Sequence, residues 1–385
     1  MTTGRYAFLD LYRGIIILVM IEGHVVRELL QPMLRATQAF QIHELLHGIT
    51  GPGFLFGAGI TFGIAAQRRW TEYLSFTPVL RKRLRRISLL LALGYMLHLP
   101  FFSLWKTLMV TREAGWISFM SFDVLQCIGS SLLILQVLML IIRKERLFVG
   151  AIVVLMLAMV YASPLIWGSE SVQGLPRAIS MALQGNSGST YPLFPNSAFL
   201  FAGAFASYEF MKFADLGRQA EFVKRLAVAG ILLHILGLVL EAIPVEVYPA
   251  IDYWQTSPNF FLIKLGGLFL LVSGVWFLEH RLFSRQFSFK ARWLLLLGVE
   301  SLFVYVVHLL AVYGWILNQE FNLSSAWAND FGWGTALGIT ALLTAVLAFL
   351  AWGWNRLKTD HVVLMKGIAW WLGGTFLYEF LTRPY

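Results

Sequence analysis

The stretch Leu9–His24 reads LDLYRGIIILVMIEGH, an apolar segment that nevertheless carries four ionisable side chains. Ionisable groups at membrane depth are costly and mark functional sites by default. Arg13 and His24 are eleven residues apart, about three helical turns, so they share one face about 16 Å apart along the axis. Asp10 lies one turn before Arg13 and is placed to pair with it, whereas Glu22 projects from the opposite face. The stretch therefore predicts a membrane helix with a functional stripe.

The composition of the whole chain extends this prediction. Apolar residues make up 58% of the 385 residues, and the mean hydropathy is +0.69. Apolar runs near the roughly 18–20 residues that cross hydrocarbon recur along the chain. We predict an all-α, polytopic integral membrane protein with about eleven transmembrane helices, forming a single domain over residues 1–385. The predicted spans are about 8–30, 48–67, 87–105, 123–142, 147–168, 194–211, 225–243, 258–279, 293–315, 333–353 and 364–381.

Lysine and arginine are distributed unevenly between the connections, which predicts the orientation. With a cytoplasmic N-terminus, the basic connections 68–86 and 281–292 lie inside, and the sparsely basic connections 31–47 and 169–193 lie outside. The net charge of +9 is thus largely a positive-inside signal and needs no nucleic acid partner. The first span is too long for a signal peptide and is kept as an anchor. The lipid bilayer, in the setting of a bacterial inner (plasma) membrane, is the expected partner.

Cysteine and histidine content limits the possible metal and redox chemistry. The single cysteine, Cys127, excludes an internal disulfide framework and a cysteine-based metal site. His43 and His47 are four residues apart and could share a face as metal ligands do, but two histidines make an incomplete site. We therefore predict no metal and expect these side chains to hydrogen-bond to backbone or water. The glycines between residues 51 and 63 favour close helix packing, or leave room for an acyl chain.

Further polar residues along the later spans are candidate site residues. Asp123 and Gln126, one turn apart, could place polar groups at the rim of an outward cavity. Lys264 lies inside a predicted span, so we expect it to meet a carboxylate or an anionic ligand. Glu300 and His308 lie in the ninth predicted span, either in a structural polar seam or in a catalytic role. The basic connection 68–86 is either a solvated face or a docking surface for an anionic ligand such as coenzyme A.

The Arg13-to-His24 spacing resembles the signature of the acyltransferase family 3 membrane enzymes. The opening FLDLYRGIIILVMIEGH, followed by HGITGPGFLFGAGI, resembles the heparan-α-glucosaminide N-acetyltransferase-like proteins even more. The resemblance implies transfer of an acyl group, commonly acetyl, from cytoplasmic acyl-CoA to a hydroxyl or amine across the membrane, with a glycan of the cell envelope as acceptor. Arg13 and His24 match the family 3 arginine and histidine. His43 matches the loop histidine of the glucosaminide group, although Leu46-His47 replaces its usual tryptophan-asparagine pair, so the base stays open between His24 and His43.

Elementary chemistry agrees with that scheme. Guanidinium groups such as that of Arg13, supported by Asp10, would neutralise the phosphates of acyl-CoA, the expected co-substrate. An imidazole deprotonates an acceptor hydroxyl near neutral pH, and His24 either acts only as this base or carries the acyl group covalently.

Two other classes of function are also open. Glu22, Lys264 and Glu300 inside spans are typical of an ion-coupled secondary transporter, but the sequence shows no inverted repeat. A non-catalytic scaffold in envelope assembly is the third class. Binding of acyl-CoA would separate an enzyme from both. The identity of the acceptor, the acyl chain length and the oligomeric state are not predicted.

Overall fold

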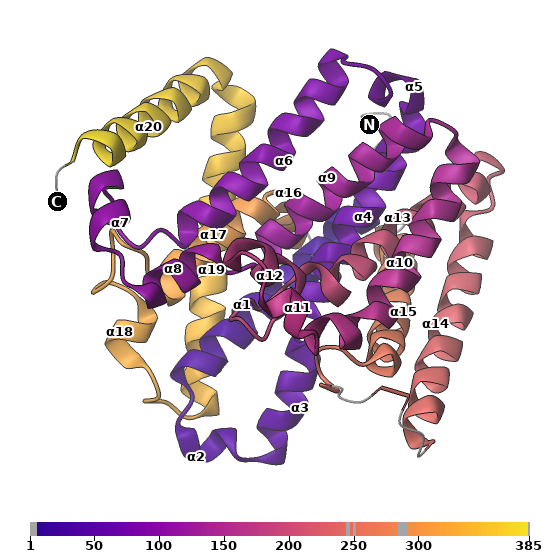
Figure 1. The fold of residues 1–385 in the computed structure, drawn as a ribbon, viewed down its shortest axis with the longest axis horizontal. Helices are drawn as coiled ribbons and strands as arrows, with labels where there is room; N and C mark the ends of the chain where they lie inside the picture. The colour runs from indigo at the N-terminus through magenta and orange to yellow at the C-terminus, as the bar shows by residue number, and fades with distance from the viewer. Residues whose placement is uncertain (1–5, 244–246, 249–251, 284–291, 384–385) are drawn as a thin grey trace. The chain divides into compact units, whose positions relative to one another are not determined.

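The computed structural model describes residues 6–243, 247–248, 252–283 and 292–383 of the chain. The elements in this part of the chain are α-helices, accompanied by a single isolated bridge between Leu30 and Phe331 (Figure 1). The all-α prediction is confirmed. The helices are α1 Ala7–Leu29, α2 Pro32–Arg35, α3 Gln38–His47, α4 Thr50–Arg68, α5 Trp70–Tyr73, α6 Pro78–Leu97, α7 Leu104–Val110, α8 Glu113–Met120, α9 Val124–Ile142, α10 Glu145–Trp167, α11 Glu170–Gln173, α12 Arg177–Leu183, α13 Leu193–Asp215, α14 Gln219–Ala242, α15 Pro258–Phe283, α16 Arg292–Val299, α17 Ser301–Val312, α18 Leu323–Trp327, α19 Trp333–Asp360 and α20 Val362–Thr382.

Several of these helices are long and apolar enough to cross a membrane, which confirms a polytopic membrane protein. Six pass this test among the described residues. The number is seven if a bent pair, α16 and α17, is taken as one span. The six are Gln38–Arg68, Val124–Ile142, Glu145–Trp167, Gln219–Ala242, Pro258–Arg281 and Trp333–Asp360. The first of these takes α3 and α4 together. The other predicted spans also coincide with helices, but these are shorter, more polar or broken. A total of eleven crossings, like the orientation, stays a prediction.

Two predicted segments differ in local structure from a straight span or an open loop. The predicted ninth span, 293–315, is two helices, α16 and α17, that meet at an angle of 86°. The predicted external connection 31–47 is largely helical, because α2 and α3 occupy it. A proline at the start of α2 and the Thr37 hydroxyl, which accepts from Phe40 N–H, explain where these two short helices begin. The connection 284–291 and parts of 244–257 lie outside the described residues.

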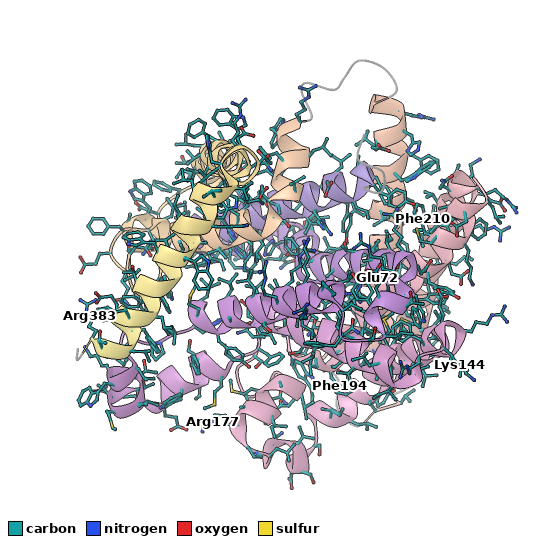
Figure 2. All side chains as sticks on the ribbon, turned by 90° about the horizontal axis from the view of Figure 1, so that it is seen from above. Glu72, Lys144, Arg177, Phe194, Phe210 and Arg383 are labelled. Carbon is teal, nitrogen blue, oxygen red and sulfur yellow. The ribbon has the colours of Figure 1, made fainter. Side chains whose placement is uncertain are left out.

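The chain forms two compact units, each described by itself, and the single-domain prediction stays a prediction. The first unit combines residues 1–50, 99–115 and 275–385. Its central element is α1, which packs against α3, α16, α17, α18 and α19 (Figure 1). In the same unit α7 packs against α20, and the Ser103 hydroxyl donates to the carbonyl of Arg383, labelled in Figure 2, at 2.6 Å.

The sequence of α1 explains its form and its place. Asp10 in the first turn and Arg27 in the last complement the helix dipole. Apolar side chains on several faces are buried, as expected for a helix surrounded by others. The helix ends where Leu30 turns extended and aligns with Phe331, whose N–H donates to the Leu29 carbonyl at 2.9 Å.

Close approach between α1 and α16 depends on glycine. A Cβ on Gly298 would overlap the carbonyl of Asp10, and one on Gly14 would overlap the carbonyl of Leu294. Two backbones in such contact leave no room for a methyl group. The pair therefore fixes α16, and with it the start of α17, against the N-terminal half of α1.

The second unit holds residues 51–98 and 116–274. It is built on the packing of α6 with α9 and of α10 and α14 with α13. A Cβ on Gly59 would overlap the Leu200 carbonyl, and one on Gly203 would overlap that of Phe56, so the glycines of α4 do permit the predicted close packing. Phe194, labelled in Figure 2 near the start of α13, precedes a cis bond to Pro195.

Candidate functional site

Four histidines gather in the first unit, although they come from three helices. His24 lies on α1, His43 and His47 lie on α3, and His308 lies on α17. His47 and His308 are buried, with 5% and 0% of their surface exposed, whereas His24 and His43 are half-buried. We call these four residues the histidine cluster. Both histidines predicted as catalytic belong to it, and so does the candidate His308.

His24 and His308 form a direct pair within the cluster. His24 Nδ1 lies 3.0 Å from His308 Nε2, and the ring centroids are 5.1 Å apart. The other ring nitrogen of His308, Nδ1, lies 3.2 Å from the Val304 carbonyl one turn earlier on α17. Tyr313 adds an edge contact to the His24 ring at 5.5 Å. His24 is thus held through one nitrogen only, and its Nε2 makes no hydrogen bond within the described part of the chain.

His43 is held by acidic side chains. Its Nε2 lies 3.0 Å from Glu22 Oε2, so the carboxylate that projects away from Arg13 on α1 still reaches the cluster. Its Nδ1 lies 3.6 Å from Glu44 Oε1, beyond hydrogen-bonding distance, and has no hydrogen-bond partner in the described residues. Glu44 is itself engaged by the Arg27 guanidinium through Nε at 3.2 Å and through Nη2. A carboxylate on Nε2 leaves Nδ1 as the basic atom of this imidazole.

His47 joins the two halves of the cluster. Its ring lies 5.4 Å from that of His24, edge-on, and stacks parallel to that of His43 with centroids 6.2 Å apart. Gly23 makes room for it, since a Cβ there would overlap the imidazole. Within the described residues no group of three histidine, cysteine or acidic side chains is arranged to hold a metal ion. From the sequence, we expected His47 to hydrogen-bond to backbone or water, and its Nδ1 does lie 3.4 Å from the Val19 carbonyl. The central position of His47 between His24 and His43 was not predicted.

Aromatic side chains enclose the His43 end of the cluster. Phe40 stacks on His43 at 5.6 Å, and Trp333 meets the same ring edge-on at 5.7 Å. Rigid rings on two sides restrict the orientation of the imidazole, as a positioned acid–base group requires.

The predicted pair at the N-terminal end of α1 is present. Arg13 Nη1 lies 3.5 Å from Asp10 Oδ1, with the Arg13 side chain 24% exposed and that of Asp10 8% exposed. The Arg13 guanidinium is therefore accessible, whereas Asp10 is buried where α1 packs against α16. The distance is long for a charge-assisted hydrogen bond.

Glu300 lies at the bend between α16 and α17 and is bound by two side chains of α19. It occupies the break between α16 and α17, and its carboxylate accepts from Lys358 Nζ at 2.6 Å and from Asn355 Nδ2 at 2.7 Å. The Glu300 side chain is 3% exposed and that of Lys358 is 40% exposed. Lys358 and Asn355 therefore compensate the charge of a carboxylate that is buried at the bend.

The three candidates of the second unit have local partners. Asp123 caps α9, because its carboxylate accepts from Val124 N–H at 2.7 Å. Gln126, expected at a cavity rim, is instead fully buried against Gly94. Lys264, expected to meet a carboxylate or an anionic ligand, lies 3.5 Å from the Trp254 carbonyl and 4.2 Å from the Phe260 ring centroid, with no ion pair within 4 Å among the described residues. These residues are not assembled into one site.

Comparison with known proteins shows to which family the chain belongs. A family model described as heparan-alpha-glucosaminide N-acetyltransferase, catalytic, matches residues 5–239, more than half of the chain. The chain belongs to this family. A search among curated proteins finds no match. The heparan-alpha-glucosaminide N-acetyltransferase match covers α1 and α3, and thereby His24, His43 and His47, and it makes the protein an acetyltransferase-like membrane enzyme. His308, Lys264 and Glu300 lie beyond the matched residues.

Proposed function

We propose that this protein transfers an acetyl group from acetyl-CoA on the cytoplasmic side of a membrane to a hydroxyl or amine of an extracytoplasmic glycan. The observation that carries the proposal is the family match over residues 5–239, which contains three histidines of one cluster. We further propose a bacterial inner membrane, with the N-terminus cytoplasmic, from the distribution of lysine and arginine.

The reaction needs a base near the acceptor. The acceptor oxygen or nitrogen forms a bond to the acetyl carbonyl carbon, and the bond from that carbon to the coenzyme A sulfur breaks. The acceptor loses one proton to an imidazole nitrogen, and the thiolate takes one from solvent. A neutral histidine is suited to this task near neutral pH.

We assign the base to His24. His308 occupies its Nδ1, which leaves Nε2 as the atom for the acceptor proton. The same Nε2 would carry the acetyl group if transfer passed through an acyl-histidine. Arg13, accessible on the same face of α1, is proposed to bind the phosphates of acetyl-CoA, with Asp10 orienting the guanidinium.

His43 is the alternative base, and its surroundings support it. The Glu22 carboxylate on Nε2 would stabilise the imidazolium formed when Nδ1 takes a proton, as the acid of a catalytic triad does. The two assignments nominate different nitrogen atoms on different helices, so substitutions separate them.

The test measures acetyl transfer by the purified protein in lipid nanodiscs, with radiolabelled acetyl-CoA as donor and a glucosamine-terminated oligosaccharide as acceptor. If His24 is the base, His24→Ala should lower kcat by about 10²–10⁴-fold, and His43→Ala should cost much less. His234→Ala is the control, because that imidazole lies in the second unit with its Nδ1 3.2 Å from the Ile263 carbonyl.

The opposite ranking would move the base to His43. A parent protein that binds no acetyl-CoA would overturn the enzyme proposal and favour a transporter or a scaffold. Normal transfer by both histidine variants would overturn the proposed role of the cluster.

A further inference from the structure

His308 is the member of the histidine cluster that the family match does not cover. It lies 284 residues from His24 in sequence, yet the two imidazoles are 3.0 Å apart. It is 0% exposed, so bulk solvent does not reach its ring. Tyr305, one turn earlier on α17, meets its ring edge-on at 5.5 Å and limits its rotation.

The hydrogen atoms of the pair follow from what each partner accepts. The Val304 carbonyl accepts only, so the His308 Nδ1 that lies 3.2 Å away carries a hydrogen and donates it. A neutral His308 then has a lone pair on Nε2. The His24 Nδ1 that faces this lone pair must carry a hydrogen, because two lone pairs at 3.0 Å repel each other. His24 Nε2 is left with a lone pair.

The charge of the pair supports the same arrangement. If both rings were protonated, two cations would face each other at hydrogen-bonding distance in a buried site, which is strongly unfavourable. The stable state has one neutral imidazole, His308, that accepts the hydrogen bond and a second imidazole, His24, that donates it. When His24 takes a proton at Nε2, its Nδ1–H still donates to His308, and this bond is strengthened by the new positive charge.

We propose that His308 is a positioning residue that holds His24 in the tautomer with hydrogen on Nδ1, and so presents the Nε2 lone pair for acetyl transfer. This inference rests on the proposed function and on His24 as its base. His308 accepts the hydrogen bond before and after the acceptor is deprotonated. It passes no proton onward, because its own Nδ1–H is directed at a helix carbonyl, so the proton on His24 leaves through Nε2.

Two substitutions separate this role from packing. His308→Leu fills much of the space but offers no acceptor to His24, so kcat should fall about 10–100-fold with KM for acetyl-CoA little changed, as for other residues that orient a catalytic group. His308→Gln supplies an amide oxygen at a similar reach and should retain a larger share of kcat than His308→Leu. His234→Leu, at a site outside the cluster, is the control. Equal loss in the Leu and Gln variants would overturn the proposed role.

A spectroscopic readout tests the tautomer without any substrate. In protein labelled with ¹⁵N-histidine, the nitrogen shifts show which ring atom bears hydrogen, and His24→Gln assigns the His24 signals. We expect hydrogen on His24 Nδ1 in the parent protein and a mixture of tautomers in His308→Leu. Hydrogen on His24 Nε2 in the parent, measured at a pH where the ring is neutral, would overturn the inference even if acetyl transfer is normal.

The two proposals therefore fail separately. The parent spectrum needs no variant at position 308, so misfolding of His308→Leu leaves the test decisive. Absence of acetyl transfer in the parent would overturn the proposed function, and with it the catalytic purpose of the pair, whatever the spectrum shows.

Discussion

The contact between α1 and α16 predicts that a single methyl group at Gly298 destabilises the element that carries the site. A Cβ on Gly298 would overlap the Asp10 carbonyl oxygen and lie 2.9 Å from the Gly14 amide nitrogen. Both obstacles are backbone atoms, so the upper end of the range for overpacking, about 3 kcal/mol, applies. Alanine recovers about 1 kcal/mol through its better helix propensity. The net expectation for Gly298→Ala is a loss of about 2 kcal/mol of stability.

Gly338→Ala is the matched control. Gly338 lies within α19, and a Cβ there meets nothing within 4 Å, so only the propensity gain of up to about 1 kcal/mol remains. We would measure the thermal unfolding midpoint of both variants and of the parent in the same detergent. Gly298→Ala should unfold below the parent, and Gly338→Ala at or above it. If the midpoint of Gly298→Ala equals that of Gly338→Ala, the backbone contact between α1 and α16 is wrong.

Two further substitutions test other contacts of the first unit. Gly23→Ala should displace the His47 ring, because a methyl group there overlaps it, and should lower kcat by about 10–100-fold while the unfolding midpoint changes little. Kinetics identical to the parent would show that the position of His47 does not matter. Breaking a fully buried ion pair by removing one partner costs about 3–5 kcal/mol of stability. Lys358→Met should cost less than this, because the Lys358 side chain is 40% exposed and only its partner Glu300 is buried. Adding Glu300→Gln should restore most of that loss in thermal unfolding, and additive losses would refute the ion pair.

Local spacing was sufficient to predict contacts within a single helix. Residues three or four apart on a helix meet, so the pairing of Asp10 with Arg13 followed directly from the sequence. The Arg13-to-His24 spacing placed both side chains on one face of α1 for the same reason. The contact of Glu22 with His43 was not predicted, because His43 comes from a neighbouring helix.

Contacts between residues far apart in the sequence could not be predicted from spacing within one helix. The pair of His24 with His308 joins the first helix to α17, and no periodicity within either segment indicates it. Glu300 lies in an apolar run that reads as one helix, yet the chain turns there by 86°. Its partner Lys358 belongs to α19, so the bend is a tertiary effect. Lys264 shows the same limit, because its contacts with the Trp254 carbonyl and the Phe260 ring were not predicted.

The matched residues 5–239 do not contain all that the site needs in this chain. They include α1 and α3, but the first compact unit also contains residues 275–385. From that part come α16 and α19, which pack along α1, and His308, which holds His24. Val26 of α1 and Leu30, which directly follows that helix, are buried in a cluster with Ala336 of α19, so removing the C-terminal part would expose apolar surface of this region as well as the His24 ring. The acetyl transfer that we propose for the family region therefore depends on the C-terminal helices, both for the stability of α1 and for the tautomer of its histidine.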